Sequence, residues 1–436
     1  MYNPANTKLV RQMLEKILNS RNLERSLSAV ERNRGSGGID DMQSDELRPF
    51  VNANRRLLVK QILKGSYQPS PVRKVEIPKA SGGVRMLGIP TVTDRMIQQA
   101  IYQWLRPMYE EEFDKDSYGF RPGKNAHQAV LTAQRYLNEG YDWIIELDLE
   151  KFFDKVNHQK LMHLLSQKVK DKRTLLLINA YLKSGIMEGG LVSQRIEGTP
   201  QGSPLSPLLS NIMLNELDRE LRERGHRFVR YADDCSIYVG SEKSAKRVAE
   251  NIIKYIESEL LLKVNREKTR ISRSNESHLL GFSFYKSKGR HEIRISEKSL
   301  HRIQTKCKTI TRSSDPTDTR SRLIKLDQVI RGWVNYFRIA KANTKMEVLD
   351  EMVRSRLRIL TWRAWRRIRT KFANLVHLGI EHSKAYMWAN TSKGPCRVSR
   401  SPILRRTLNI SYWHEAGYVS FSTYYSSWQD HRGTLF

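Results

Sequence analysis

Apolar and polar positions follow two different periods along the first 310 residues. Four stretches have strand character: residues 72–90 form a predicted extended hairpin, residues 143–149 a buried strand, residues 228–239 two strands that meet at a tight turn, and residues 279–284 a short strand pair. Between them, apolar residues recur every three to four positions, which predicts amphipathic helices at residues 9–18, 47–64, 94–113, 160–169, 205–224 and 242–262. This alternation predicts a mixed α and β body.

The pattern changes after the polar stretch at residues 311–319, which has the sequence TRSSDPTDT. This composition is typical of a loop, and we expect a domain boundary there. Beyond it the chain is predicted to be helical. One apolar stripe repeats at helical spacing over residues 323–337, and residues 346–371 are predicted to form the next helix.

The net charge indicates the class of molecule that the chain binds. The 436 residues include 76 Lys and Arg against 46 Asp and Glu, a formal net charge of +30, with 39% hydrophobic residues. Residues 301–436 hold 26 basic and 9 acidic residues, more than half of the excess. A folded body with so positive a surface attracts polyanions, so nucleic acid is the expected partner.

Other classes of protein are not expected. The chain has no run of about 18 consecutive apolar residues and no charged flank leading into an apolar segment near Met1, so we expect a cytoplasmic protein without membrane contact. Cys235, Cys307 and Cys396 are far apart and form no C-x-x-C pair, which excludes a zinc module or disulfide framework built from them.

Three aspartates stand out in so basic a chain. Asp148 ends the predicted strand, and Asp233 and Asp234 occupy the tip of a predicted hairpin over residues 228–239. Isolated carboxylates are costly to bury, and Mg²⁺ relieves their repulsion by accepting carboxylate, water and phosphate oxygens. Two such ions can clamp an in-line phosphoryl displacement. The alternative is an exposed acidic turn with an unrelated strand carboxylate.

Three motifs occur in order: LDLEKFF at residues 147–153, TPQGSPLSP at residues 199–207 and YADD at residues 231–234. With them, the sequence resembles the bacterial group II intron reverse transcriptases, or maturases, over nearly its whole length. The resemblance implies an α+β right-hand polymerase with fingers, a ferredoxin-like palm, a helical thumb and a small basic extension. The implied domains are an N-terminal extension at 1–70, fingers and palm at 71–295, the thumb or maturase (X) domain at 296–371 and a DNA-binding-like extension at 372–436.

The same resemblance assigns the catalytic residues. Asp148, the Leu149 carbonyl, Asp233 and Asp234 are implied to hold two Mg²⁺ ions, with Mn²⁺ as the alternative metal. Lys268 matches the lysine that family members place near the leaving pyrophosphate as a general acid. A surface ion pair between this lysine and Glu267 or another acid stays open.

Further positions are implied to bind the incoming nucleotide. Phe153, five residues beyond Asp148, matches an aromatic steric gate against a ribose 2′-OH, unless Phe152 and Phe153 are both core residues. Gln201 is implied to lie beside the dNTP, unless residues 199–207 are a plain helix-entry loop. Lys79 and Arg85, which flank the turn of the predicted hairpin, match the family's triphosphate-gripping pair, and a solvated surface role is the alternative.

Other residues are implied to contact nucleic acid. Arg121 in SYGFRPG matches a template or nucleotide contact, and Leu280 and Gly281 match the primer grip. RGWVNYF at residues 331–337 resembles the maturase signature. Eight basic residues lie among 351–371, including the predicted phosphate contacts Arg363, Arg366 and Arg367. The tryptophans within this run are expected either to stack on bases or to pack in the core: Trp362 and Trp365.

The function implied is RNA-directed DNA synthesis on a group II intron RNA, primed at a DNA target or a replication fork, together with assistance in intron splicing. The expected partners are the intron RNA, a DNA target or primer and dNTPs, and the sequence does not decide between monomer and dimer. Many relatives end in an HNH endonuclease, whereas this chain has only Cys396 in that region, so we expect no cleavage of the second DNA strand. Two alternatives stay open: a splicing cofactor with an idle polymerase site, and a domesticated reverse transcriptase in DNA repair or phage defence.

Overall fold

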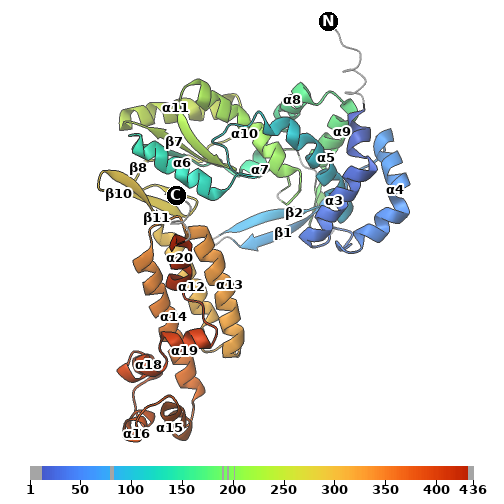
Figure 1. The fold of residues 1–436 in the computed structure, drawn as a ribbon. Helices are drawn as coiled ribbons and strands as arrows, with labels where there is room; N and C mark the ends of the chain where they lie inside the picture. Colours follow the sequence, from blue (N-terminus) through green and yellow to red (C-terminus); the bar gives the residue numbers. More distant parts are fainter. Residues whose placement is uncertain (1–11, 79–82, 189–190, 194–195, 201, 431–436) are drawn as a thin grey trace. The chain divides into compact units, whose positions relative to one another are not determined.

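The computed structural model describes residues 12–78, 83–188, 191–193, 196–200 and 202–430. These form two compact units, the first ending at Arg273 and the second beginning at Ser274 (Figure 1).

The first unit is built on a four-stranded antiparallel sheet with the order β6-β7-β3-β8. Its strands are β3 (Trp143–Leu147), β6 (Arg227–Tyr231), β7 (Asp234–Val239) and β8 (Arg270–Arg273). Helices separate the first strand from the second and the third from the fourth, so in chain order the sheet reads 4-1-3-2. This is the ferredoxin-like palm that the sequence predicted.

Helices cover both faces of this sheet (Figure 1). Ile145 and Ile237 belong to the large core that also contains the buried faces of α10 (Ser206–Glu223) and α11 (Glu242–Ser258). The opposite face receives α6 (Ala126–Asn138), whose Tyr136 ring lies 5.7 Å from that of Tyr238. Because successive strand residues point to opposite faces, a strand covered on both sides is a nearly continuous apolar run.

A second sheet belongs to the fingers. Strands β1 (Val72–Pro78) and β2 (Val84–Ile89) form the predicted antiparallel hairpin, and β4 (Ile186–Glu188) pairs in parallel with β1. Strand β5 (Leu191–Ser193) completes the sheet. The surrounding helices pack into the same large core as the palm: α2 (Met13–Ile17), α3 (Ser20–Asn33), α4 (Leu47–Lys64), α5 (Val92–Glu110), α7 (Phe152–Lys155), α8 (His158–Lys168) and α9 (Lys172–Lys183).

The second unit begins with a small antiparallel sheet and continues as helices. The sheet contains β9 (His278–Leu279), β10 (Phe282–Ser287) and β11 (Arg290–Ile295). The helices are α12 (Glu297–Ile310), α13 (Thr319–Phe337), α14 (Asn343–Ala364), α15 (Ile368–His377), α16 (His382–Ala389), α17 (Pro395–Val398), α18 (Pro402–Thr407), α19 (Ile410–Glu415) and α20 (Phe421–Asp430). The helix predicted at 346–371 is therefore interrupted between Ala364 and Ile368.

Two boundaries differ from the sequence-based expectation. The predicted fingers and palm domain extends to residue 295, but β9–β11 group with the helices that follow, because the Phe282 ring packs against Tyr336 and Phe337 at 5.5 and 4.9 Å. Residues 311–319, expected to separate domains, lie inside the second unit. Arg322, whose side chain is 4% exposed, donates hydrogen bonds to carbonyl oxygens of this segment. Within the described residues, no helix is both long enough and apolar enough to cross a bilayer.

Candidate active site

The three predicted aspartates lie at one end of the palm sheet. In the β3–β7 ladder Leu147 pairs with Cys235, so the next residue, Asp148, lies beside Asp234, the first residue of β7. Asp233 occupies the tight turn that precedes this strand. A cavity of about 930 Å³ is lined by all three side chains. Residues 85 positions apart in the sequence therefore converge on one pocket.

Electrostatics show that these carboxylates repel one another. Desolvation, together with the charges of Asp233, Asp148 and Glu146, raises the pKa of Asp234 to about 6. Asp234 is open to solvent on one side, but the protein atoms around it remove enough water to make desolvation the largest cause. Within the described residues, no group of three or more His, Cys, Asp or Glu side chains is arranged to hold a metal ion. The three carboxylates therefore supply oxygen ligands of the kind that hard divalent cations prefer, and they repel one another. They do not form a complete metal-binding site by themselves.

Leu149 and Lys268 lie in the same cavity wall. Asn265 N donates to Asp148 O at 2.8 Å and Glu150 N donates to Lys263 O at 2.8 Å, bonds that do not involve the Leu149 carbonyl. Lys268 Nζ lies 3.6 Å from Asp148 Oδ2, and the lysine side chain is 70% exposed. The ion-pair partner of this lysine is therefore a member of the carboxylate cluster.

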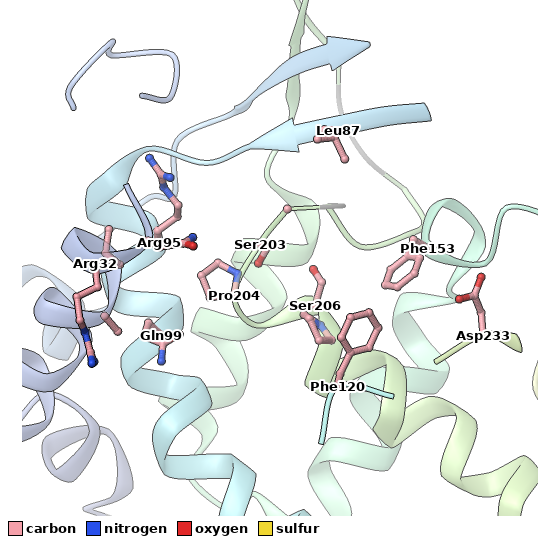
Figure 2. A pocket seen from close by; sticks show the side chains of 15 residues that line it. Arg32, Leu87, Arg95, Gln99, Phe120, Phe153, Ser203, Pro204, Ser206 and Asp233 are labelled. Carbon is pink, nitrogen blue, oxygen red and sulfur yellow. The ribbon is translucent and has the colours of Figure 1, made fainter. Parts of the chain in front are cut away.

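The structure separates the two adjacent phenylalanines. Phe152 is 2% exposed and belongs to the core, whereas Phe153 is half-buried and lines the same cavity wall as Asp233 (Figure 2). The Phe153 carbonyl accepts a hydrogen bond from Thr199 N at 2.6 Å, which ties it to the loop at residues 199–207. The exposed member of the pair is thus the one that the resemblance assigned as a gate.

A buried ion pair holds the turn that carries Asp233. Arg230 and Asp218 are both fully buried, with Nε to Oδ1 at 2.7 Å and Nη2 to Oδ2 at 2.5 Å. Arg230 Nη1 also donates to Ala232 O and to Asn211 Oδ1, both at 2.9 Å. A fork of this kind fixes geometry because all three guanidinium nitrogens are directed at separate acceptor atoms. We call Arg230, Asp218 and Asn211 the hairpin clamp.

Gly119 packs directly beneath the same turn. Asn211 Nδ2 donates to Gly119 O at 2.9 Å. A Cβ atom at position 119 would lie 2.2 Å from Ala232 N, and real Cβ contacts are never so short. The glycine is therefore required by the close approach of two backbones. Ala232 itself has a positive φ of 59°, which a small residue tolerates at modest cost.

Arg121 has a different role from the predicted template or nucleotide contact. Its side chain is 6% exposed, and Nε donates to Glu110 Oε1 at 2.8 Å. Nη1 donates to the carbonyls of Asp114 and Ser117 at 2.5 and 2.8 Å. Because these donors are committed to protein acceptors, Arg121 fixes the loop that follows α5.

Two of the other residues predicted to bind the nucleotide, Lys79 and Gln201, lie outside the described residues. Arg85 lies in β2, opposite Ile77 of β1.

A second cavity, of about 800 Å³, extends from Phe153 and Asp233 toward α3 and α5. Figure 2 shows Phe153 and Asp233 at one end and Arg32, Arg95 and Gln99 at the other. Arg95 is 7% exposed and donates to Ser36 O at 2.6 Å. Neither these arginines nor the hairpin clamp could be predicted from sequence, because a charged residue gives the same signal whether it faces water, a cavity or a buried partner.

In the second unit, the predicted primer-grip residues form a firmly held turn. Leu280 and Gly281 have positive φ angles of 52° and 82°. Leu280 O accepts a hydrogen bond from Tyr336 Oη at 2.9 Å, and Gly281 O accepts from Ser296 N and Ser299 Oγ, both at 3.0 Å.

The predicted phosphate contacts of this unit are accessible. Arg363, Arg366 and Arg367 are exposed where α14 gives way to α15. Of the two tryptophans among them, Trp362 is 2% exposed and therefore a core residue, whereas Trp365 is half-buried.

Comparisons with known protein families find one match in each main part of the chain. Residues 77–284 match the family described as "Reverse transcriptase (RNA-dependent DNA polymerase)", and residues 300–379 match "Group II intron, maturase-specific domain". Protein YkfC of Escherichia coli K12 is 33% identical over 298 residues, covering 59% of this chain and 78% of YkfC.

Two further similarities cover part of the compared protein. The group II intron-encoded protein LtrA of Lactococcus lactis subsp. cremoris is 30% identical over 318 residues, covering 57% of this chain and 52% of LtrA, so the match spans about half of that relative. Among solved structures, the partial Cas6-RT-Cas1–Cas2 complex is similar with a TM-score of 0.37 and 25% identity, covering 56% of this chain and 42% of that one. The two matched domains and the sequence relatives YkfC and LtrA show that the chain belongs to the group II intron-encoded reverse transcriptases, RNA-directed DNA polymerases that carry a maturase domain.

Proposed function

We propose that the chain extends the 3′-OH of a DNA primer with dNTPs on a group II intron RNA template, with Asp148, Asp233 and Asp234 as its metal ligands. The observation that carries this proposal is the convergence of the three carboxylates on one cavity, with the pKa of Asp234 raised by desolvation and by its acidic neighbours. Two Mg²⁺ ions, or Mn²⁺, would also be held by the Leu149 carbonyl and would activate the primer oxygen and neutralise charge on the leaving pyrophosphate.

Side chains of the cavity supply the remaining steps. Lys268 is placed beside Asp148 and is largely exposed, so its ammonium group can deliver a proton to the leaving pyrophosphate. The Phe153 ring excludes a ribose 2′-OH by steric overlap. Lys79, Arg85 and Gln201 hold the triphosphate and the base of the incoming dNTP.

The second cavity gives a path for the template strand. Arg32, Arg95 and Gln99 offer donors for phosphate and base atoms between α3 and α5, and the cavity reaches Asp233. In the second unit, the Leu280–Gly281 turn supports the primer end, and Arg363, Arg366 and Arg367 bind RNA phosphates. Copying starts from a nicked DNA target or from a nascent strand at a replication fork.

Asp233→Asn tests the catalytic assignment. Primer extension on an RNA template at saturating Mg²⁺ should fall by about 10³-fold, because the substitution removes one ligand charge where negative charge must be balanced. RNA affinity should change by less than about twofold, since a neutral amide replaces a carboxylate. Asp45→Asn, which removes an exposed acid before α4, should extend primers like the unmodified chain. Full activity of Asp233→Asn would refute the assignment.

The match of residues 300–379 to the maturase-specific domain supports a second activity, assistance in splicing of the intron RNA. A splicing assay with Asp233→Asn separates the two activities. Splicing should continue at the unmodified rate while DNA synthesis stops, because residues 300–379, which match the maturase-specific domain, include none of the three carboxylates. Loss of both activities together would contradict this division.

A further inference from the structure

A cavity of about 510 Å³ in the second unit is lined mainly by charged residues. Glu351, Arg354 and Arg358 come from α14 and Arg405 comes from α18, with the start of α19 completing the wall. We call these three arginines and the glutamate the arginine pocket. It is separate from the predicted phosphate contacts at residues 363–367.

One carboxylate serves all three guanidinium groups. Glu351 Oε2 lies 3.2 Å from Arg354 Nη2, while Glu351 Oε1 lies 3.3 Å from Arg358 Nη1 and 3.7 Å from Arg405 Nη2. The pocket therefore carries two formal positive charges in excess.

Burial makes this excess charge costly. The side chain of Arg358 is 4% exposed and that of Arg354 is 13% exposed. Desolvation lowers the pKa of Arg358, although Glu351 opposes that shift. The buried Nε of Arg354 has no hydrogen-bond acceptor among the described residues. Arg358 Nε donates to Leu408 O at 3.2 Å, so the unmet needs of the pocket are an acceptor for Arg354 Nε and negative charge for the two excess guanidinium groups.

We propose that the arginine pocket binds a phosphate group of a nucleic-acid backbone. A phosphodiester supplies what the pocket lacks, a negative charge and acceptor-only oxygens, and guanidinium forks match its geometry. Arg405, which is 56% exposed, stands at the mouth and makes the first contact. Asn409 and Ser411 add polar groups to the wall, and Ile410, which is 50% exposed, offers apolar surface to the adjoining sugar. The ligand class is therefore phosphodiester, shared by RNA and DNA.

Arg405→Ala tests the proposal, with Arg406→Ala as its matched control. Arg406 is the next residue of α18, is also exposed and does not line the pocket, so both variants lose one charge from the same helix. Binding of fluorescent 20-nucleotide RNA and DNA single strands by the full chain would be titrated across KCl concentrations. Arg405→Ala should weaken both by about fivefold and reduce the slope of log K against log salt by about 0.7, the value for one phosphate contact. Arg406→Ala should change affinity less than twofold.

Glu351→Gln makes the opposite prediction. It leaves three arginines without a counter-charge, so binding of the same strands should tighten by about threefold. A purely structural ion-pair cluster would give equal effects for the 405 and 406 variants and no tightening with Glu351→Gln, and either result overturns the proposal. If Glu351→Gln melts at a lower temperature, Arg405→Glu against Arg406→Glu provides the same comparison on exposed positions. All these readouts are binding constants, so they stand apart from the Asp233→Asn test of polymerisation.

Discussion

The hairpin clamp and the arginine pocket use the same chemistry in opposite ways. In the clamp, Arg230 meets Asp218 one to one, and neither side chain is exposed. In the pocket, three arginines share Glu351, which is 43% exposed. Balanced charge in a sealed site fixes backbone position, whereas unbalanced charge at an opening leaves capacity for a ligand. The number of carboxylates per arginine and their access to water therefore distinguish a structural cluster from a binding cluster.

The largest expected effect comes from breaking the clamp. Asp218→Asn leaves Arg230 as a buried charge without its counter-ion and should reduce the free energy of unfolding by about 3–5 kcal/mol. Glu351→Gln should cost less, about 1–2 kcal/mol, because Glu351 is 43% exposed and Gln keeps an acceptor oxygen for the buried Arg354 and Arg358. Urea unfolding of the full chain, followed by circular dichroism, measures both. Equal losses in the two variants would remove the distinction between sealed and open clusters.

A substitution beneath the turn, at Gly119, tests whether local packing positions Asp233. Gly119→Ala forces Ala232 and the adjacent Asp233 to move, because the new Cβ would lie 2.2 Å from Ala232 N. The expected cost is about 1–3 kcal/mol of stability. Primer extension should fall by at least about tenfold, since displacement of a catalytic group by about 1 Å has effects of that size or larger.

Gly240→Ala is the control for this experiment. Gly240 follows β7, and a Cβ there would have open space around it. It should leave primer extension and stability close to those of the unmodified chain. If Gly119→Ala extends primers at the unmodified rate, the close packing of Gly119 against Ala232 does not position the turn that carries Asp233.

The smallest expected effect concerns two adjacent rings, the buried Phe152 and the half-buried Phe153. Phe153→Val should raise the use of rNTPs relative to dNTPs by about tenfold, corresponding to about 1.4 kcal/mol of lost discrimination. Phe152→Leu should lower the melting temperature and leave the rNTP to dNTP ratio unchanged, because Phe152 is a core residue. Single-nucleotide incorporation with paired rNTP and dNTP measures the ratio. A shifted ratio in Phe152→Leu alone would reverse the gate assignment.

Local pattern was sufficient to predict the strands that carry the three aspartates, and the family resemblance supplied their arrangement as a palm. The apolar strand ending at Asp148 and the hairpin carrying Asp233 have signals within a few residues, and their convergence followed from the family resemblance. The clamp was not predictable in this way, because Asp218 and Arg230 are polar residues whose pairing depends on tertiary packing. The role of Arg121 was equally hidden in the sequence. It lies in a motif and was therefore assigned to a ligand, but its partners are Glu110 and backbone carbonyls.

The domain boundary depended on aromatic packing that the chain order does not reveal. Phe282 contacts rings that follow it by more than 50 residues, and this contact places the small sheet with the helices. The interruption after Ala364 was hidden because the basic, helix-favouring run continues through it.

The attachment of the Leu280–Gly281 turn to its own helices has a mechanical consequence. Tyr336 of α13 and Ser299 of α12 donate hydrogen bonds to the two carbonyl oxygens of this turn, so the turn and the two helices are expected to move together. A variant that displaces α12 or α13 is therefore expected to displace the Leu280 and Gly281 carbonyls with it.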